Sequence, residues 1–269
     1  MQLLNALIAG LIQGLTEFLP VSSSGHLVLF HEVFGFEFGD NVFFDVAMHA
    51  ATLAALVLFF RREVVVLVRG FFRLFKRPDL KSDLEARLAL LVMAGSVPVV
   101  LVGALVYPLL GSGVRSVPVV ITTLAVVALV FFVAERFGRR ERMMSTMTAG
   151  DALLIGAAQS VALVPGVSRS GITICAGMAR RLKRDEAARF SFLISIPAVA
   201  AAVVKSSLEV ESWAAVDWRV LGLGFLAALL SGLFAIRILL RFVGRHPLHV
   251  FAWYRLALAA AAVAWLALR

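Results

Sequence analysis

The stretch of sequence that decides the fold is Gln13-Gly-Leu-Thr-Glu17-Phe-Leu-Pro20-Val-Ser22-Ser23-Ser24-Gly25-His26. It brings an amide, a carboxylate, a run of three serines and an imidazole together, and mostly apolar residues flank it at 3–9 and 27–30. Ionisable side chains inside a membrane are costly to keep and are a functional-site hypothesis by default. We therefore take this stretch as the candidate site and the rest of the chain as its scaffold.

The composition predicts an all-α polytopic membrane protein. The 269 residues are 61% hydrophobic and only 16% charged, with a mean hydropathy of +0.94. A helix needs about 20 apolar residues to cross a bilayer. The segments that reach or approach this length are 45–60, 88–106, 119–134, 191–204, 220–240 and 252–268. We expect one integral membrane domain over residues 1–269, with no cleavable signal peptide. The single cysteine excludes an intramolecular disulfide.

The net charge of +9 is distributed as expected for a membrane protein, not for a nucleic-acid-binding one. Lys and Arg gather in 61–87, 136–142 and 180–189, whereas 31–40 and 206–217 are acidic. Loops of alternating charge are what the positive-inside rule predicts. We expect no nucleic-acid partner, and we place the N-terminus, the first acidic loop and the C-terminus on the outer side.

The first helix is expected to break at Pro20. The residue before a proline is driven out of the helical region, so the helix should end near Leu19. A second short apolar run then extends to about Phe34. Irregular backbone at membrane depth is tolerated only where protein or a water-filled cavity surrounds it. We therefore predict a re-entrant helix-loop-helix with the serine loop at its tip, and two full spans remain the alternative.

A second copy of the motif lies 146 residues further along the chain. The recurring pairs are Gly10 and Gly156, Gln13 and Gln159, Val21 and Val167, Ser22 and Ser168, Ser24 and Ser170, and Gly25 and Gly171. In the second copy Arg169 replaces Ser23, and Leu163 replaces Glu17. The two copies therefore share an architecture but differ in chemistry.

Each copy is predicted to belong to one half of an inverted-topology repeat, with repeat 1 at 1–135 and repeat 2 at 150–269. Each half would contain one re-entrant helix-loop-helix and three transmembrane helices. Because three is odd, the second half must enter the membrane from the opposite side. Broken helices from the two halves of such folds meet at a site near the midplane.

The amide, the carboxylate and the serine turn each offer a specific chemistry. Gln13 and Glu17 are four residues apart and share one helical face, where they either line a site or form a buried pair. The turn Ser22-Ser23-Ser24-Gly25 offers hydroxyl and backbone N–H groups to an anion, although an ordinary serine N-cap is the alternative. The matching groups of the second copy are Ser168, Ser170 and Gly171.

Two further residues complete the candidate site. His26 could be a general acid, a general base or a nucleophile, or simply a packed, hydrogen-bonded histidine. Arg169 is expected at the deep tip of the second hairpin, where its guanidinium could bind phosphate oxygens in a bidentate way. The alternative for Arg169 is a structural ion pair with Glu17 across the repeat interface. Asp45 and His49 share a helical face and are weaker candidates.

The two motifs, taken together, resemble those of a known family. They are Gln13-x-x-x-Glu17 with Pro20-Val-Ser-Ser-Ser-Gly-His26, Pro165-Gly-Val-Ser-Arg-Ser-Gly171, and Ala188-Arg-Phe-Ser-Phe-Leu-Ile-Ser-Ile-Pro197. The chain thereby resembles the undecaprenyl-diphosphate phosphatases, also called bacitracin-resistance proteins, over essentially its whole length. The resemblance implies a membrane enzyme that hydrolyses undecaprenyl diphosphate to undecaprenyl phosphate and inorganic phosphate. This recycles the lipid carrier for peptidoglycan synthesis and gives bacitracin resistance.

By position, the resemblance implies catalytic roles for Glu17, Ser23, His26 and Arg169. It leaves open whether His26, Ser23 or water is the nucleophile. Glu17 is also the expected ligand of a divalent cation, Mg²⁺ or Ca²⁺. Gln13 stands where some members have glutamate, so one carboxylate fewer is available. The diphosphate oxygens would then have to supply most of the ligands.

The expected partners are the polyprenyl diphosphate substrate and membrane lipids, and a homodimer is left open. The expected location is the bacterial inner membrane, as a multi-pass protein whose active site opens to the periplasmic side. The alternative function is a transporter or flippase of polyprenyl phosphate, because inverted repeats with broken helices are typical of transporters. In that case Glu17 would be a coupling proton site and Arg169 an anion anchor. The serine-glycine-histidine constellation favours the phosphatase, because transport alone would not require it.

Overall fold

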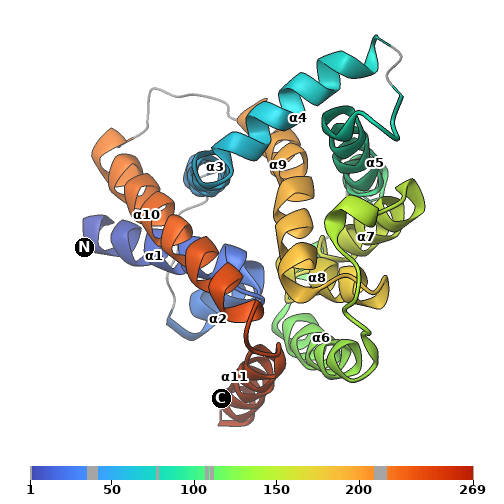
Figure 1. Ribbon diagram of the computed structural model, residues 1–269. Coiled ribbons are helices and arrows are strands. Elements are labelled where there is room, and N and C mark those ends of the chain that lie inside the picture. Colours follow the sequence, from blue (N-terminus) through green and yellow to red (C-terminus); the bar gives the residue numbers. More distant parts are fainter. Residues whose placement is uncertain are drawn as a thin grey trace.

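The computed structural model describes residues 2–34, 42–76, 79–106, 109, 112–208 and 217–268, and its regular elements there are helices (Figure 1). The helices are α1 (Gln2–Phe18), α2 (Ser23–Phe34), α3 (Val42–Phe59), α4 (Arg61–Leu74), α5 (Leu84–Leu105), α6 (Val117–Phe137), α7 (Ala149–Val161), α8 (Arg169–Ala179), α9 (Arg184–Leu208), α10 (Trp218–Val243) and α11 (His249–Leu268), with short 3₁₀ turns η2 (Ser112–Arg115) and η3 (Met144–Thr146). The predicted all-α class is confirmed.

Five of these helices are long and apolar enough to cross a membrane. They are α5, α6, α9, α10 and α11, and α3 contains a shorter apolar stretch, Val46–Phe59. All six correspond to segments predicted from the sequence, although α9 begins seven residues before the predicted 191–204 segment. The prediction of a polytopic helical membrane protein is therefore confirmed.

The short helix pairs have the dimensions of re-entrant hairpins. Helices α2 and α8 have 12 and 11 residues, which at about 1.5 Å per residue is far short of the roughly 30 Å hydrocarbon core. Helix α1 ends at Phe18, two residues before Pro20, as the proline predicts. The two hairpin loops meet, because the backbone N–H of Gly166 donates to Ser24 Oγ at 3.4 Å. These lengths and this contact favour the hairpin prediction over two full spans.

The prediction that 61–87 is only a basic loop is wrong, because Arg61–Leu74 form α4. Helix α4 runs across the top of the view in Figure 1, above α5. Gly70 of α4 packs so closely on α5 that a Cβ at this position would lie 2.1 Å from the Glu85 carbonyl oxygen. Arginines alternate with apolar residues at helical spacing here, which is typical of an interfacial amphipathic helix. The exposed apolar side chains of α4 are Val65, Val68, Phe71 and Phe72.

The two copies of the motif pack their helices in the same way. A Cβ on Gly10 of α1 would lie 2.3 Å from the Gly224 carbonyl oxygen of α10, and one on Gly156 of α7 would lie 2.1 Å from the Gly95 carbonyl oxygen of α5. Only glycine allows backbones to approach so closely, as is common between membrane helices. Both copies thus place their first short helix against a span of the other half. The inverted orientation of the halves in the membrane stays a prediction.

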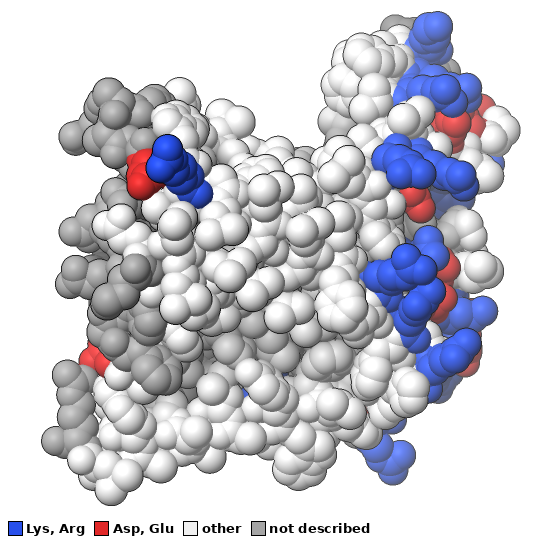
Figure 2. Space-filling view, turned by 90° about the vertical axis from the view of Figure 1, so that its left-hand side faces the viewer, with Lys and Arg blue, Asp and Glu red and all other residues white. Residues whose placement is uncertain are grey.

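The basic clusters lie together on one face of the molecule. Arg189 pairs with Glu63 at 3.8 Å, and Arg181 pairs with Glu141, so segments far apart in sequence meet there. Figure 2 shows Lys and Arg gathered along one edge, next to a broad surface that has almost none. An apolar belt beside a basic face is the arrangement expected of a membrane-embedded chain.

Candidate functional site

The loops and helix ends of the two hairpins surround a cavity of about 220 Å³. This is several times the roughly 30 Å³ that one water molecule occupies in the liquid, so the cavity has room for a small anion but not for a long hydrocarbon chain. Its polar lining residues are Thr16, Glu17, Ser22, Ser23, Ser24, His49, Gln159, Ser168 and Arg169. The opposite wall is apolar and comes from α5, α9 and the turn after α7, with Val99, Leu163 and Val199 among its residues.

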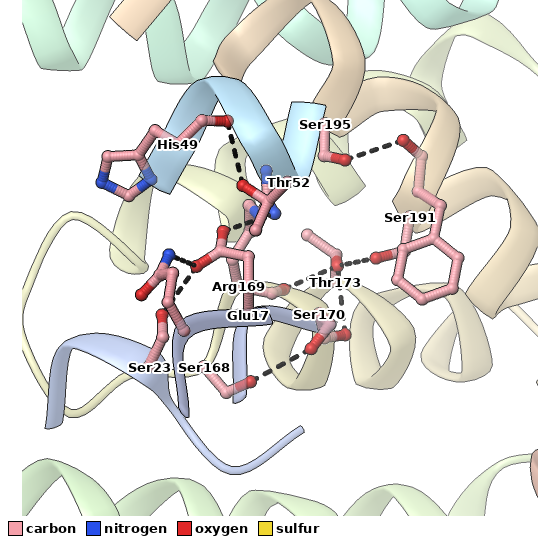
Figure 3. Close-up of polar contacts among 12 residues, drawn as sticks. Glu17, Ser23, His49, Thr52, Ser168, Arg169, Ser170, Thr173, Ser191 and Ser195 are labelled. Atoms are coloured by element: carbon pink, nitrogen blue, oxygen red, sulfur yellow. Dashed lines mark hydrogen bonds and ion pairs between the residues drawn. The ribbon is translucent and has the colours of Figure 1, made fainter. Parts of the chain in front are cut away.

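Glu17 is the centre of the hydrogen-bonding network in this cavity (Figure 3). Its Oε2 accepts from Ser23 Oγ at 2.7 Å and from Gln13 Nε2 at 3.1 Å. Its Oε1 accepts from Arg169 Nη2 at 2.8 Å. The expected sharing of one helical face by Gln13 and Glu17 is thus confirmed. A carboxylate, a hydroxyl and a guanidinium from opposite halves of the chain meet at one point.

Arg169 is the first residue of α8, and its side chain is only 16% exposed. One of its two terminal nitrogens, Nη2, donates to Glu17. The other, Nη1, is buried and has no hydrogen-bond partner in the part of the chain that the structure describes. The N-terminal end of a helix also carries partial positive charge. The ion pair with Glu17 that the sequence offered as an alternative is present, and the free nitrogen leaves Arg169 able to bind an anion as well.

The serine turns are built as N-caps in both copies. Ser22 Oγ accepts from the Gly25 backbone N–H, and Ser168 Oγ accepts from that of Gly171, both at 3.2 Å. Ser22 has a φ of 75°, a left-handed conformation that is uncommon for serine and often marks functional sites. Ser22, Ser24 and Ser168 line the cavity. Gly25, Ser170 and Gly171 support the turns from outside this lining, with Ser170 buried.

His26 is not brought to the cavity. Its Nδ1 lies 2.7 Å from the Ser22 carbonyl oxygen, and its Nε2 lies 2.6 Å from the Tyr254 hydroxyl of α11. The two rings are stacked, with centroids 5.7 Å apart. The expectation that His26 reaches the same cavity as Glu17 is therefore not met, because the first turn of α2 directs Ser23 inward and His26 toward α11. The catalytic role of His26 stays a prediction.

The sequence matches the family described as "Bacitracin resistance protein BacA" over residues 6–261. The chain belongs to the BacA family. A relative named undecaprenyl-diphosphatase from Rubrobacter xylanophilus is 46% identical over 100% of both chains. Relatives of the same name from Myxococcus xanthus and Alcanivorax borkumensis are 41% and 38% identical and cover 96% and 98% of this chain, and 87% and 98% of their own.

Gln159 and Thr16 are polar residues of this BacA-family site that the sequence did not predict. Gln159 lines the cavity and is 1% exposed. The available signal was the repeat, since Gln159 is the counterpart of Gln13, which was selected. His49 also lines the cavity, although it was only a weak candidate, and the side chain of Asp45 lies outside the described residues.

The donor set does not fit a metal site built from side chains alone. Among the described residues, no three His, Cys, Asp or Glu side chains gather as they would around a metal ion. Glu17 is the one carboxylate among the cavity residues named above, and both of its oxygens already accept hydrogen bonds. Mg²⁺ and Ca²⁺ require six or more oxygen ligands, so the expected cation would depend on ligands from a bound phosphate.

Proposed function

We propose that this chain is a membrane phosphatase that hydrolyses undecaprenyl diphosphate to undecaprenyl phosphate and inorganic phosphate. The observation that carries this function is the Ser23–Glu17–Arg169 chain of contacts at the centre of a small polar cavity. Membership of the BacA family and the names of the full-length relatives support the same activity. A phosphatase needs an anion anchor and an activated nucleophile, and this cavity offers both.

Arg169 is the proposed anchor of the diphosphate. Its free Nη1 can donate to one non-bridging oxygen, and Nη2 can transfer from Glu17 to a second oxygen when the substrate enters. Bidentate binding of this kind suits the planar guanidinium. Phosphoryl transfer is accelerated mainly by positioning and by neutralising charge on the equatorial oxygens. The exchange of partners also releases Glu17 from its ion pair.

Ser23 and Glu17 form the proposed nucleophile and base. Ser23 Oγ already donates to Glu17 Oε2 at 2.7 Å, which is the distance required for proton transfer to a general base. Ser23 Oγ would bond to the terminal phosphorus as its proton passes to Glu17, and the bond to the bridging oxygen would break. Undecaprenyl phosphate leaves, and water then hydrolyses the phosphoserine to inorganic phosphate. His26 would act as a positioning residue that holds the turn through Ser22 and Tyr254.

The apolar wall of the cavity is the proposed entrance for the lipid tail. Helices α5 and α9 present Val99, Val199 and Ala202 there, so the isoprenoid can remain among the spans while its head group occupies the polar end. We further propose that the protein resides in the inner membrane with the cavity open to the periplasmic side. The basic face in Figure 2 would then be cytoplasmic. The reaction as drawn needs residues of one chain only, so it does not depend on a homodimer.

A divalent cation, Mg²⁺ or Ca²⁺, is proposed only as a companion of the bound diphosphate. Glu17 would be its one carboxylate ligand, and phosphate oxygens would supply most of the others. The ion would neutralise charge on the phosphate oxygens.

The deciding experiment is phosphate release from undecaprenyl diphosphate by purified protein in detergent. Wild type, Ser23→Ala and Arg169→Ala are compared, each with Mg²⁺, Ca²⁺ or a chelator, and rapid-quench samples are analysed for phosphoserine. We expect release by the wild type and losses of at least about 100-fold in both variants. A folded wild type that releases no phosphate under any condition would contradict the phosphatase and lead to an assay of lipid translocation. Release without phosphoserine, and with Ser23→Ala active, would exclude Ser23 as nucleophile.

A further inference from the structure

The amide of Gln159 is buried in the cavity and has no hydrogen-bond partner among the described residues. The residue is 1% exposed, and neither its Nε2 nor its Oε1 has a partner. Leaving a buried amide unpaired costs free energy, and buried polar side chains in folded proteins are nearly always satisfied. An unpaired amide in the lining of a site therefore indicates a group that makes its bonds to a ligand.

Comparison with its counterpart in the repeat shows why Gln159 is free. Gln13 has Glu17 four residues later on the same helix and donates to that carboxylate at 3.1 Å. Gln159 has Leu163 at the corresponding position, which offers no acceptor. The same amide therefore supports the base in the first half but has no partner in the second half. Both helices contribute to the lining of one cavity.

A second unpaired donor lies in the lining of this cavity, and the oxygens of a phosphate can accept from both donors. Arg169 Nη1 is buried without a partner, as is Gln159 Nε2, and both residues line the same 220 Å³ space. Non-bridging phosphate oxygens accept several hydrogen bonds at once and carry the charge that strengthens them. An amide adds a neutral donor beside the guanidinium and does not create a further charge that needs a counterion.

We propose that Gln159 binds a non-bridging oxygen of the substrate diphosphate beside Arg169, as a substrate-positioning residue of the phosphatase. This assignment rests on the proposed function. It makes Gln159 a group that recognises the diphosphate head, separate from the base network around Glu17. It also predicts that the unpaired amide weakens the ligand-free protein, since a buried polar group without partners destabilises the folded state.

The test compares Gln159→Leu, which keeps the size but removes the hydrogen bonds, with Gln159→Glu, which places a negative charge beside the phosphate. Ser160→Ala is the matched control, because Ser160 is the next residue on α7 and lies outside the cavity lining. Its hydroxyl, which the substitution removes, donates to the Gly156 carbonyl oxygen at 3.4 Å. Two readouts are made in detergent. They are KM and kcat for undecaprenyl diphosphate, and the shift in melting temperature caused by methylenediphosphonate, which cannot be hydrolysed.

We expect Gln159→Leu to raise KM by roughly 10- to 100-fold, the effect of one hydrogen bond to a charged group. Without ligand, the melting temperature of Gln159→Leu should equal or exceed that of the wild type. The rise in its melting temperature on addition of a fixed concentration of methylenediphosphonate should be smaller than in the wild type, and smaller still in Gln159→Glu. Ser160→Ala should match the wild type.

An unchanged KM and an unchanged methylenediphosphonate shift in Gln159→Leu would overturn the proposal. So would a lower ligand-free melting temperature with an unchanged shift, because that pattern is the loss of packing alone, and so would an equal rise of KM in Ser160→Ala. If the wild type bound methylenediphosphonate but hydrolysed no substrate, the proposed phosphatase activity would be refuted. The effect of Gln159→Leu on the methylenediphosphonate-induced change in melting temperature would still test the role of Gln159. If the wild type neither bound methylenediphosphonate nor hydrolysed undecaprenyl diphosphate, both the proposed function and the proposed role of Gln159 would be refuted.

Discussion

The ion pair between Glu17 and Arg169 should contribute to both the stability and the activity of the protein, and substitutions of the pair can distinguish the two contributions. The two side chains are 10% and 16% exposed and join the hairpins of opposite halves at 2.8 Å. Removing one member leaves the other as an uncompensated buried charge. We consider Arg169→Met, Glu17→Gln and the double variant, which replace the charges with side chains of similar size.

The size of the effect follows from the burial of the pair. Breaking a buried ion pair by removing one partner costs about 3–5 kcal/mol, and the residual exposure places each single variant near 3 kcal/mol. For a chain of this length that is a fall in melting temperature of roughly 6–12 °C. The double variant has no unpaired charge, so its free energy of unfolding should lie within about 1 kcal/mol of that of the wild type. The coupling energy, which is the loss in the double variant minus the two single losses, is therefore about 5–6 kcal/mol in magnitude.

The assay pairs thermal unfolding in detergent with phosphate release on the same samples. The double variant should regain its stability and remain inactive, at least about 100-fold below the wild type, because both the anchor and the base are gone. If the double variant lost as much stability as the two single variants together, the ion pair would not couple the two hairpins. If Arg169→Met kept its activity within tenfold of the wild type, phosphate binding by Arg169 would be refuted.

Three further predictions concern packing, the support of the site and pH. Gly10→Ala should destabilise the fold by about 1–3 kcal/mol and lower its melting temperature, because its Cβ would lie 2.3 Å from a backbone oxygen of α10. In the control Gly222→Ala, the new Cβ has no neighbour within 4 Å among the described residues, so the melting temperature should not fall. Equal melting temperatures of the two variants would contradict the close approach at Gly10. Tyr254→Phe removes the partner of His26 Nε2 and should cost about 1 kcal/mol and lower turnover; unchanged turnover would show that this contact does not position the site. The Asp83 carboxylate caps α5 by accepting from the backbone N–H of Ala86, and this bond holds the pKa of Asp83 below its usual value. The capping bond therefore contributes its full stabilisation above about pH 4. This stabilisation is lost as the pH falls through the lowered pKa. The difference in melting temperature between wild type and Asp83→Ala should therefore shrink only in acid, and a difference independent of pH would contradict the cap.

Local spacing predicted those site contacts that lie within one helix or one turn. Gln13 and Glu17 share a face because they are four residues apart, and that geometry is independent of the rest of the fold. Ser22 and Ser168 cap the helices that follow them, as the motif predicts. Spacing could not place His26, because the choice between the cavity and α11 depends on Tyr254, 228 residues further along the chain.

The amphipathic helix α4 shows a different limit. Its arginines correctly indicated a basic segment, but because of them the segment was predicted to be a loop. The structure shows a helix there, and its packing on α5 depends on Gly70. Gln159 shows a third limit. The repeat identified it as the counterpart of Gln13, but whether its amide is paired depends on what surrounds it in three dimensions.

The sequence by itself determined the membrane class, the six apolar helices, the break at Pro20 and the choice of Arg169 as a buried charge that must have an anionic partner. These follow from composition, proline geometry and the cost of an isolated charge in an apolar medium, none of which requires a fold. Only the tertiary structure decided that Ser23 contacts Glu17, that His26 turns to Tyr254 and that Gln159 is unpaired. The first contact depends on how the chain turns between α1 and α2, and the second joins residues that are 228 positions apart. The state of the Gln159 amide depends on the residues packed around it, so all three are properties of the packed structure.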